Sequence, residues 1–360
     1  MYLDSFKDLE VSHVIQIFED LGFQATGHCT PLNSLENRVF LIYVFNEKLP
    51  DIFEEDSIIN TGKFIIKFYR PNRWNHQQIQ EEHDFLYELK ESEIPVISPL
   101  RMKNGQSIFK KNSYIYSIWP NQKGRLVEEI HGRNLVVLGR LLARIHNVGS
   151  TKVVKHRVKF GLDEFGIKPL QYLIKNEFIR GSLLKRYESA AHHIFEKYNL
   201  YSQNIPFHRI HGDCHRGNLI QIDESYCFID FDDTMEGPAV QDLWMLLPFD
   251  TQHEGDIQEF LSGYREFREF NFDWFQLVEP LRGLRYIYYA AWISRRIHEP
   301  NFQNTFPHFG SDEYWERETR DLENLVSGIF SQSDTELDNQ SDNQKNDENL
   351  TNKDFFWDME

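Results

Sequence analysis

The spacing of hydrophobic residues changes twice along the chain. Apolar positions recur every three or four residues over 6–21, which predicts an amphipathic helix. Two apolar runs with strand character follow, RVFLIYVF at 38–45 and KFIIKFY at 63–69. A second helix is predicted over 77–90, and a further strand, SYIYSIW, over 113–119. The first third of the chain therefore alternates helix and strand signals.

Beyond residue 135 the pattern becomes mainly helical. The helical stretches are 135–147, 170–200 and 255–298. A strand-rich patch at 207–232 interrupts them. Because strands gather in the first third and helices in the rest, we expect an α+β protein with two lobes. We place a small β-rich nucleotide-binding lobe at 1–119 and a larger helical catalytic lobe at 120–330.

Composition narrows the possible partners. The 360 residues carry 39 basic and 56 acidic side chains, a formal charge of −17, so we expect neither a nucleic-acid nor a membrane-surface binder. Three cysteines, no apolar leader and no run of 18 apolar residues suggest a cytoplasmic protein. Residues 331–360 hold nine acids and two lysines with few apolar residues, so we expect an acidic disordered tail there.

The segment IHGDCHRGNLIQIDESYCFIDFDD, at 210–233, concentrates the chemistry. Its two apolar runs predict a hairpin over 219–229, and a turn centred on Glu224 would place Asn218 opposite Asp230, roughly 5 Å away. An amide oxygen beside a carboxylate suits Mg²⁺. With Asp213 five residues before Asn218, the order acid, asparagine, hairpin, acid is that of a kinase catalytic loop: Asp213 as base, and Asn218 and Asp230 as metal ligands.

The same segment allows a second interpretation. His208, His211, Asp213 and His215 could form a metal cluster of a metal-dependent hydrolase. Gly212 and Gly217 indicate an irregular loop there, however, and this scheme leaves Asn218 and Asp230 without a role. We therefore interpret His211 as a loop anchor, and His208 and His215 as surface residues.

The N-terminal lobe offers a cation for nucleotide phosphates. Lys67 lies in the apolar run KFIIKFY, where an ammonium group is costly unless it meets an anion. On the helix that follows, Glu82 falls within the apolar stripe whereas Glu81 points away, so we predict that Glu82 pairs with Lys67. A purely structural ion pair is the alternative.

Two further residues complete the predicted nucleotide site. The segment 30–38 occupies the place of a phosphate-covering loop but lacks G-x-G-x-x-G, and its Ser34 hydroxyl is the candidate phosphate ligand. Trp119, at the predicted junction between the lobes, is the candidate contact for adenine. Ser34 as an ordinary turn residue and Trp119 as a structural residue are the alternatives.

Several segments together resemble a known family. They are LNSLENRVF, KFYRPNRW, QEEHDFL, LGRLLARIH, IHGDCHRGNLI, FIDFDDTMEGPAVQDLWMLL and EPLRGLRYIYYAAWISRR, and they extend from about residue 25 to 325. With them the chain resembles the bacterial stress-response serine/threonine protein kinases, in the aminoglycoside-phosphotransferase-like branch of the kinase fold. The departures are His-Gly-Asp at 211–213 in place of His-Arg-Asp, DFD at 230–232 in place of DFG, and the acidic tail.

The resemblance implies a role for each matching residue. Asp213 would accept the proton of the substrate hydroxyl, and Asn218 and Asp230 would bind Mg²⁺. Lys67 would hold the α- and β-phosphates of ATP, with Ser34 above them. Asp242 would tie down the backbone of the catalytic loop.

We therefore expect a monomeric cytoplasmic kinase that uses ATP and Mg²⁺ to phosphorylate protein serine or threonine hydroxyls in a stress response. A small-molecule acceptor, such as an amino alcohol, sugar or antibiotic, is the first alternative. A nucleotide-binding pseudokinase scaffold is the second, although the set Lys67, Asp213, Asn218 and Asp230 is intact.

Overall fold

The described residues form two compact units. The computed structural model describes residues 6, 9–46, 48–54, 62–127, 130–222, 225–247 and 253–328, so the predicted acidic tail lies outside them. The first unit comprises Met1–Leu126, Lys155–Arg157 and Leu219–Asp232, and the second comprises the remaining segments. Two late segments thus belong with the N-terminal part, whereas the sequence places a single boundary at 119/120. As a division of function, that boundary stays a prediction.

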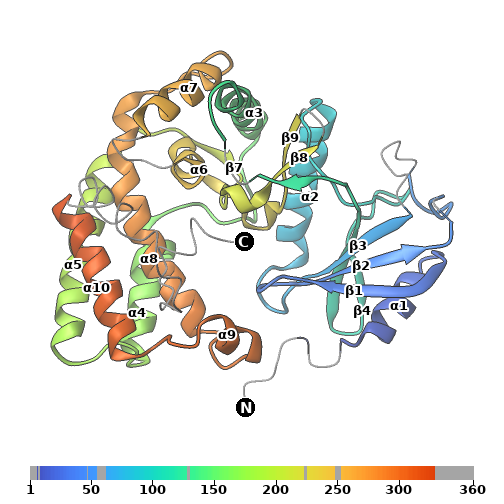
Figure 1. The fold of residues 1–360 in the computed structure, drawn as a ribbon, viewed down its shortest axis with the longest axis horizontal. Coiled ribbons are helices and arrows are strands. Elements are labelled where there is room, and N and C mark those ends of the chain that lie inside the picture. The colour runs from blue at the N-terminus through green and yellow to red at the C-terminus, as the bar shows by residue number, and fades with distance from the viewer. Residues whose placement is uncertain are drawn as a thin grey trace, which may run out of the picture. The chain divides into compact units, whose positions relative to one another are not determined.

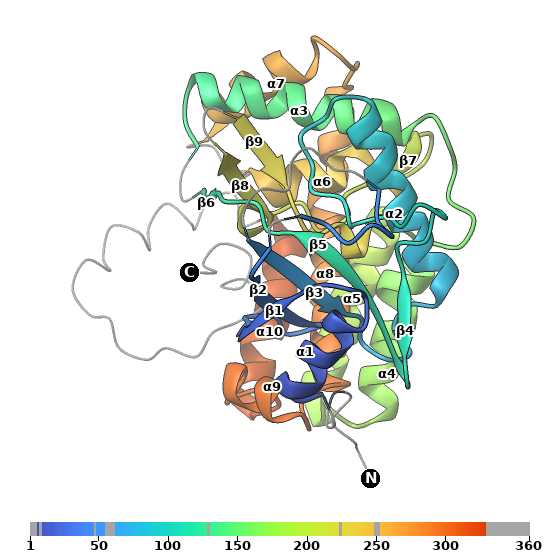
Figure 2. The same cartoon turned by 90° about the vertical axis from the view of Figure 1, so that its right-hand side faces the viewer.

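The first unit is built on a five-stranded antiparallel sheet (Figures 1 and 2). Its strands, in spatial order, are β1 (Ala25–Leu32), β2 (Arg38–Val44), β3 (Lys63–Phe68), β5 (Tyr114–Pro120) and β4 (Phe109–Lys111). Alternate residues of β3 point to opposite faces. Phe64 packs against Phe18 of helix α1 (Val11–Glu19), with ring centroids 5.9 Å apart. On the other face Tyr69 hydrogen-bonds His83 of helix α2 (His76–Glu91), at 2.8 Å.

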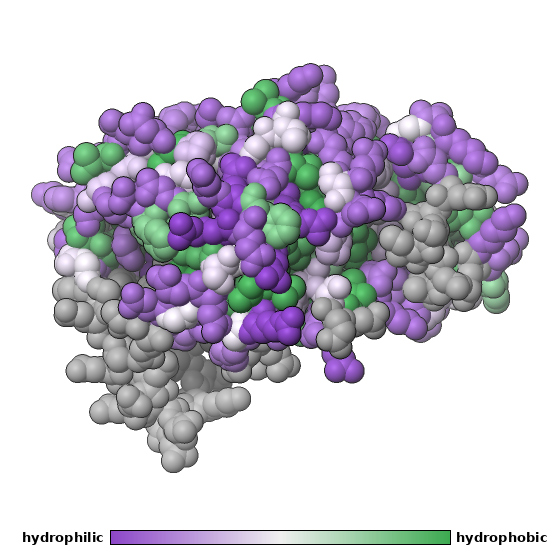
Figure 3. All heavy atoms as spheres, turned by 90° about the horizontal axis from the view of Figure 1, so that it is seen from above, coloured by the Kyte–Doolittle hydropathy of each residue, from purple (hydrophilic) through white to green (hydrophobic). Residues whose placement is uncertain are grey.

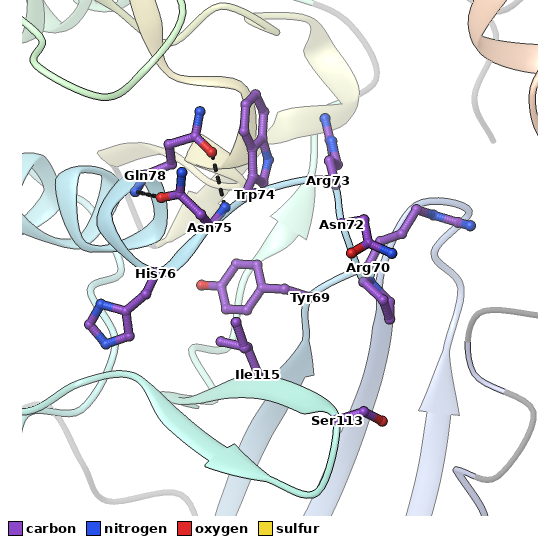
Figure 4. Close-up of a pocket in the computed structure, with 11 residues that line it drawn as sticks. Tyr69, Arg70, Asn72, Arg73, Trp74, Asn75, His76, Gln78, Ser113 and Ile115 are labelled. Carbon is purple, nitrogen blue, oxygen red and sulfur yellow. Dashed lines mark hydrogen bonds between the residues drawn. The ribbon is translucent and has the colours of Figure 1, made fainter.

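Helix α2 begins where the sequence provides a cap. Asn75 accepts a hydrogen bond from the backbone N–H of Gln78, and the Gln78 side chain accepts one from the backbone N–H of Asn75 (Figure 4). This reciprocal pair satisfies two N–H groups that the first helical turn leaves open. The apolar face of α2 is buried, which orients the helix on the sheet.

A separate three-stranded sheet completes the first unit. It contains β6 (Arg125–Leu126), β8 (Leu219–Ile222) and β9 (Ser225–Phe228), and β8 and β9 form the predicted hairpin. Leu219 pairs with Phe228 and Ile222 with Ser225, so two residues connect the strands. The observed register differs by one residue from the register that a turn centred on Glu224 would give. The predicted pairing of Asn218 opposite Asp230 is therefore wrong.

The second unit is mainly helical. Its α-helices are α3 (Arg133–Gly149), α4 (Lys168–Lys175), α5 (Gly181–Tyr201), α6 (Ala239–Leu246), α7 (Glu254–Tyr264), α8 (Val278–Ser294), α9 (Pro300–Thr305) and α10 (Asp312–Ser327). Helices α3 and α7 approach closely because each has a glycine at the contact. A Cβ atom at Gly139 would lie 2.1 Å from the Phe260 carbonyl oxygen, and one at Gly263 would lie 2.0 Å from that of Val136.

One short ladder interrupts the helices. It pairs β7 (Phe207–Ile210) with β10 (Met235–Pro238) in antiparallel register. The strand-based N-terminal part and helical C-terminal part confirm the predicted α+β class (Figure 1). Among the described residues, every helix is too short or too polar to cross a bilayer. The molecular face in Figure 3 is correspondingly dominated by hydrophilic residues, with small apolar patches between them.

Candidate active site

The Asp213 loop leaves the buried strand β7 through a sharp turn. Gly212 adopts φ +86°, and a Cβ there would lie 2.2 Å from the Asp233 carbonyl oxygen, so the turn requires glycine. The backbone N–H groups of His211 and Gly212 each donate to the carboxylate of Asp242, both at 2.9 Å. Asp242 therefore fixes the backbone immediately before Asp213, in the position that the family resemblance implies.

Asp242 is itself held by a buried network. Its Oδ2 atom lies 3.0 Å from Nε2 of His146, whose Nδ1 lies 2.8 Å from the hydroxyl of Tyr264. Burial raises the pKa of Asp242 to about 6, although His211 and the two backbone N–H groups act in the opposite direction. Burial also lowers the pKa of His146 well below its usual value, so this imidazole is neutral at pH 7.

Asp213 faces cationic and amide groups. Its Oδ1 atom lies 2.6 Å from Nη2 of Arg285 on α8, and its Oδ2 atom lies 3.3 Å from Nδ2 of Asn218 and 3.4 Å from Nε2 of His215. Asn218 also donates to the Asp213 carbonyl, at 3.0 Å. Burial opposes ionisation, but Arg285 and His215 outweigh it and hold the pKa of Asp213 well below its usual value. Asp213 is therefore an ionised carboxylate with a fixed direction.

In the first unit, Lys67 lies among three carboxylates. Its Nζ atom is 3.1 Å from Oδ1 of Asp230, 3.3 Å from Oδ1 of Asp232 and 3.9 Å from Oε1 of Glu82. Burial favours the neutral amine, but these carboxylates raise the pKa of Lys67 well above its usual value. The predicted Lys67–Glu82 ion pair is present, and it is the longest of the three.

The two acids of the DFD sequence play different structural roles. Asp230 adopts a left-handed φ of +57°, and its side chain is 53% exposed. The Asp232 side chain is buried, and its carboxylate accepts hydrogen bonds from Asn37 at 3.2 Å and from Arg73. Asp232 therefore fixes the loop that presents Asp230. From the sequence alone, Asp232 stands out only as a departure from DFG.

The segment 155–157 fastens helix α2 through two neighbouring glutamates. The carboxylate of Glu81 accepts hydrogen bonds from the backbone N–H groups of Lys155, His156 and Arg157, the last two at 2.8 and 2.7 Å. The Arg157 side chain donates to Glu82 at 2.7 Å and to the Asp232 carbonyl oxygen. Arg157, which no pattern in the sequence singles out, is a nearer partner of Glu82 than Lys67 is.

Ser34 and Trp119 lie in the predicted kinds of structure. Ser34 is half-buried in the connection between β1 and β2. Trp119 is half-buried in β5, its Nε1 donates to Ser117 at 2.7 Å, and its ring centroid lies 5.8 Å from Nζ of Lys67. Their contacts with nucleotide stay predictions.

The donor groups fit Mg²⁺ better than a transition metal. Among the described residues, no group of three histidine, cysteine or acidic side chains could hold a metal ion, which disfavours the metal-hydrolase interpretation. His208 is also buried, with its ring 4.8 Å from that of His146, so its prediction as a surface residue is wrong. The exposed carboxylate of Asp230 supplies oxygen ligands of the kind that bind Mg²⁺ together with substrate phosphates.

A cavity of about 480 Å³ lies elsewhere in the first unit. Tyr69, Arg70, Trp74, His76 and Ile115 contribute to its lining (Figure 4). The lining contains none of the predicted site residues, so this cavity is distinct from the ion pairs around Lys67.

Comparison with known proteins identifies the class. A model described as the phosphotransferase enzyme family matches residues 55–277, well over half of the chain. The chain belongs to this family. Stress response kinase A of Escherichia coli K12 is 33% identical over 317 residues, which cover 88% of this chain and 92% of that protein. The serine/threonine protein kinase RdoA of Salmonella typhimurium is 34% identical over 320 residues, with the same coverage. The resemblance seen in the sequence is thus confirmed.

Solved structures share the fold at lower identity. An amicoumacin kinase in complex with AMP-PNP, Ca²⁺ and Ami superposes with a TM-score of 0.66 at 17% identity, over 88% of this chain and 93% of that one. A microcompartment-associated aminopropanol kinase gives 0.64 at 16% identity, over 88% and 98%. These likenesses confirm the predicted aminoglycoside-phosphotransferase-like fold.

Proposed function

We propose that this protein is a cytoplasmic kinase that uses ATP and Mg²⁺ to phosphorylate serine or threonine hydroxyls of proteins, in a bacterial stress response. The observation that carries the phosphotransferase chemistry is the 3.1 Å contact between Lys67 and Asp230, a phosphate-binding cation beside a candidate metal ligand. The protein acceptor and the stress response rest on the relatives, stress response kinase A and serine/threonine protein kinase RdoA.

In this proposal the first unit binds the nucleotide. Lys67 holds the α- and β-phosphates, and Glu82 helps to hold Lys67. Ser34 donates its hydroxyl to a phosphate oxygen, and Trp119 packs against adenine. Asp230 and Asn218 are the protein ligands of Mg²⁺, which neutralises charge on the phosphates when it is bound.

Asp213 acts on the acceptor. Its ionised carboxylate accepts a hydrogen bond from the substrate hydroxyl, directs the oxygen towards the γ-phosphorus atom and takes up the proton. Asp242 and Asn218 keep the loop and the carboxylate in place, at the distances given above. Catalysis then rests mainly on positioning and on electrostatic stabilisation.

A small-molecule acceptor is the second candidate. It is favoured by the solved structures with the same fold, which include kinases named for amicoumacin and aminopropanol. Both candidates use Asp213 to accept the proton of the acceptor hydroxyl, so substitution of Asp213 does not distinguish them.

An acceptor screen separates the candidates. Purified protein is incubated with Mg²⁺ and γ-labelled ATP, together with protein and peptide hydroxyls or with a panel of amino alcohols, sugars and aminoglycosides. Asp213→Ala serves as the inactive control. Transfer to serine or threonine supports the proposal, and transfer confined to small alcohols supports the second candidate. Nucleotide binding without any turnover would overturn both and favour a pseudokinase.

A further inference from the structure

Helix α8 brings an arginine to the predicted catalytic carboxylate. Arg285 Nη2 lies 2.6 Å from Oδ1 of Asp213, and the two side chains are 21% and 22% exposed. One turn further along α8, Tyr289 is half-buried and stacks on Trp292, with ring centroids 5.1 Å apart. The same face of α8 therefore carries a cation at the reacting group and aromatic rings beside it.

The neighbours of Asp213 are mainly cationic or neutral. His215 lies 3.4 Å from its Oδ2 atom, and Nδ1 of His211 lies 3.3 Å from its backbone nitrogen. The nearby carboxylate of Asp242 is engaged by two backbone N–H groups and by His146. Arg285 thus balances the negative charge of Asp213, while the nearby Asp242 carboxylate is already hydrogen-bonded elsewhere.

This arrangement discriminates among acceptors by charge. A hydroxyl bonded to Asp213 stands about 3 Å from a carboxylate oxygen, which places it roughly 5–6 Å from the Arg285 guanidinium. In an amino alcohol, the ammonium group two carbons away interacts with both members of the Asp213–Arg285 ion pair, so Arg285 offsets the attraction that Asp213 alone would exert on it. Arg285 likewise offsets the repulsion that Asp213 alone would exert on a carboxylate next to a serine hydroxyl.

We propose that Arg285 is a specificity-determining residue of the acceptor site, which favours serine or threonine hydroxyls flanked by acidic side chains and disfavours alcohols that carry an ammonium group. The inference rests on the proposed function, because it assumes that Asp213 receives the acceptor hydroxyl. It deepens that function by naming the acceptor class.

The test compares acceptors that differ in charge and little in shape. The peptide SQSDTELDN, whose sequence occurs at 331–339 of this chain, provides acid-flanked hydroxyls. Its counterpart SQSNTQLNN removes every charge isosterically, and 1-amino-2-propanol represents the cationic alcohols. The enzymes are the unaltered protein, Arg285→Gln, Arg285→Lys and Arg282→Gln. The last removes an arginine one turn earlier on α8, which pairs with Glu279 at 3.4 Å.

We expect the unaltered protein to use the acidic peptide with a kcat/KM about tenfold above that of the neutral peptide, and to use 1-amino-2-propanol least. Arg285→Gln should lose the preference with little change in KM for ATP, Arg285→Lys should keep part of it, and Arg282→Gln should keep it in full. Thermal unfolding of each variant shows whether it is folded. If Arg285→Gln does not fold, the comparison of Arg285→Lys with the unaltered protein still tests the proposal.

The remaining outcomes separate a failure of the role of Arg285 from a failure of the kinase activity. Equal use of the two peptides by the unaltered protein, a preference that survives in Arg285→Gln, or amino alcohol as the best acceptor overturns the role of Arg285 but leaves the kinase chemistry standing. Failure of every acceptor, charged or neutral, overturns the proposed function itself.

Discussion

The Lys67 and Asp213 clusters are electrostatic opposites. In the first unit, one buried ammonium group lies within 4 Å of three carboxylates. In the second, one carboxylate is contacted by a guanidinium, an imidazole and an amide. The surrounding groups raise the pKa of Lys67 and lower the pKa of Asp213, so both central groups remain charged at pH 7 despite burial.

The contrast agrees with the different task that is proposed for each cluster. A permanent cation flanked by acids suits a phosphate bound together with a divalent ion. The phosphate oxygens can replace the acids around the ammonium group, and the divalent ion can bind a carboxylate that is released. A permanent anion beside a guanidinium suits a neutral hydroxyl, whose proton it would accept while the guanidinium balances incoming phosphoryl charge. Substitutions in one cluster should therefore affect nucleotide binding, and substitutions in the other should affect transfer.

The largest effect is expected from Asp213→Ala. If Asp213 is the proton acceptor that we propose, loss of its carboxylate also removes the orientation of the hydroxyl, so kcat should fall by about 10³-fold or more. The affinity for Mg·ATP, measured by calorimetric titration, should remain close to that of the unaltered protein. Transfer at an unchanged rate would contradict the role given to Asp213, and a parallel loss of nucleotide affinity would erase the contrast between the clusters.

Arg157→Gln should give the largest loss of stability. The substitution leaves the buried carboxylate of Glu82 without its nearest cation, and the free energy of unfolding in urea should fall by about 3–5 kcal/mol. The matched control is Arg186→Gln, which removes an exposed arginine that pairs with Glu316 and Glu323 and should have little effect. Equal losses of unfolding free energy in the two variants would show that burial of the Arg157–Glu82 pair does not determine its contribution to stability.

Asp242→Asn should change how stability depends on pH. Because burial raises the pKa of Asp242 in the folded state to about 6, from 3.8, the folded state binds the proton more tightly. The stability that this group contributes is complete below pH 3.8 and is lost as the pH rises through 6. Relative to Asp242→Asn, the unaltered protein should lose about 2–3 kcal/mol across that window. The comparison uses urea unfolding of both proteins between pH 3.5 and 6.5, and a constant difference would refute the shift.

The smallest effect is expected from Asp230→Ala. Removing one candidate metal ligand should weaken the binding of Mg·ATP by about tenfold to a hundredfold, roughly 1.4–2.8 kcal/mol. Titrations with and without Mg²⁺ give the measurement, and the loss should be confined to the titration that contains Mg²⁺. An unchanged affinity in both would remove Asp230 from the metal site.

Local patterns in the sequence predicted the elements that carry the site. Strand β3 and helix α2 lie within a residue or two of their predicted bounds, because each has a regular apolar period. Burial of Glu82 followed from its position in the apolar stripe of α2. The roles inferred from the order of Asp213, Asn218 and Asp230 stay predictions, and the structure adds the contacts that fix Asp213.

The remaining features depend on contacts between distant segments. Arg157 lies 75 residues after Glu82 in a stretch without a periodic pattern, and Arg285 lies 72 residues after Asp213. Glu81 was expected to point away from the core, and it does lie on another side of α2, where it binds backbone N–H groups that no pattern predicts. The hairpin register was missed because a two-residue connection was treated as a turn centred on Glu224. Such connections match the twist of paired strands.

The first unit is assembled from three separate segments of the chain, and this has a consequence for its folding during synthesis. The unit contains the N-terminal segment together with Lys155–Arg157 and Leu219–Asp232. These three segments leave the ribosome at three separate times. A fragment that stops at residue 126 would lack Arg157, Asp230 and Asp232. Nascent chain must therefore extend past residue 232, nearly two thirds of the protein, before Lys67 can meet all of its acidic partners.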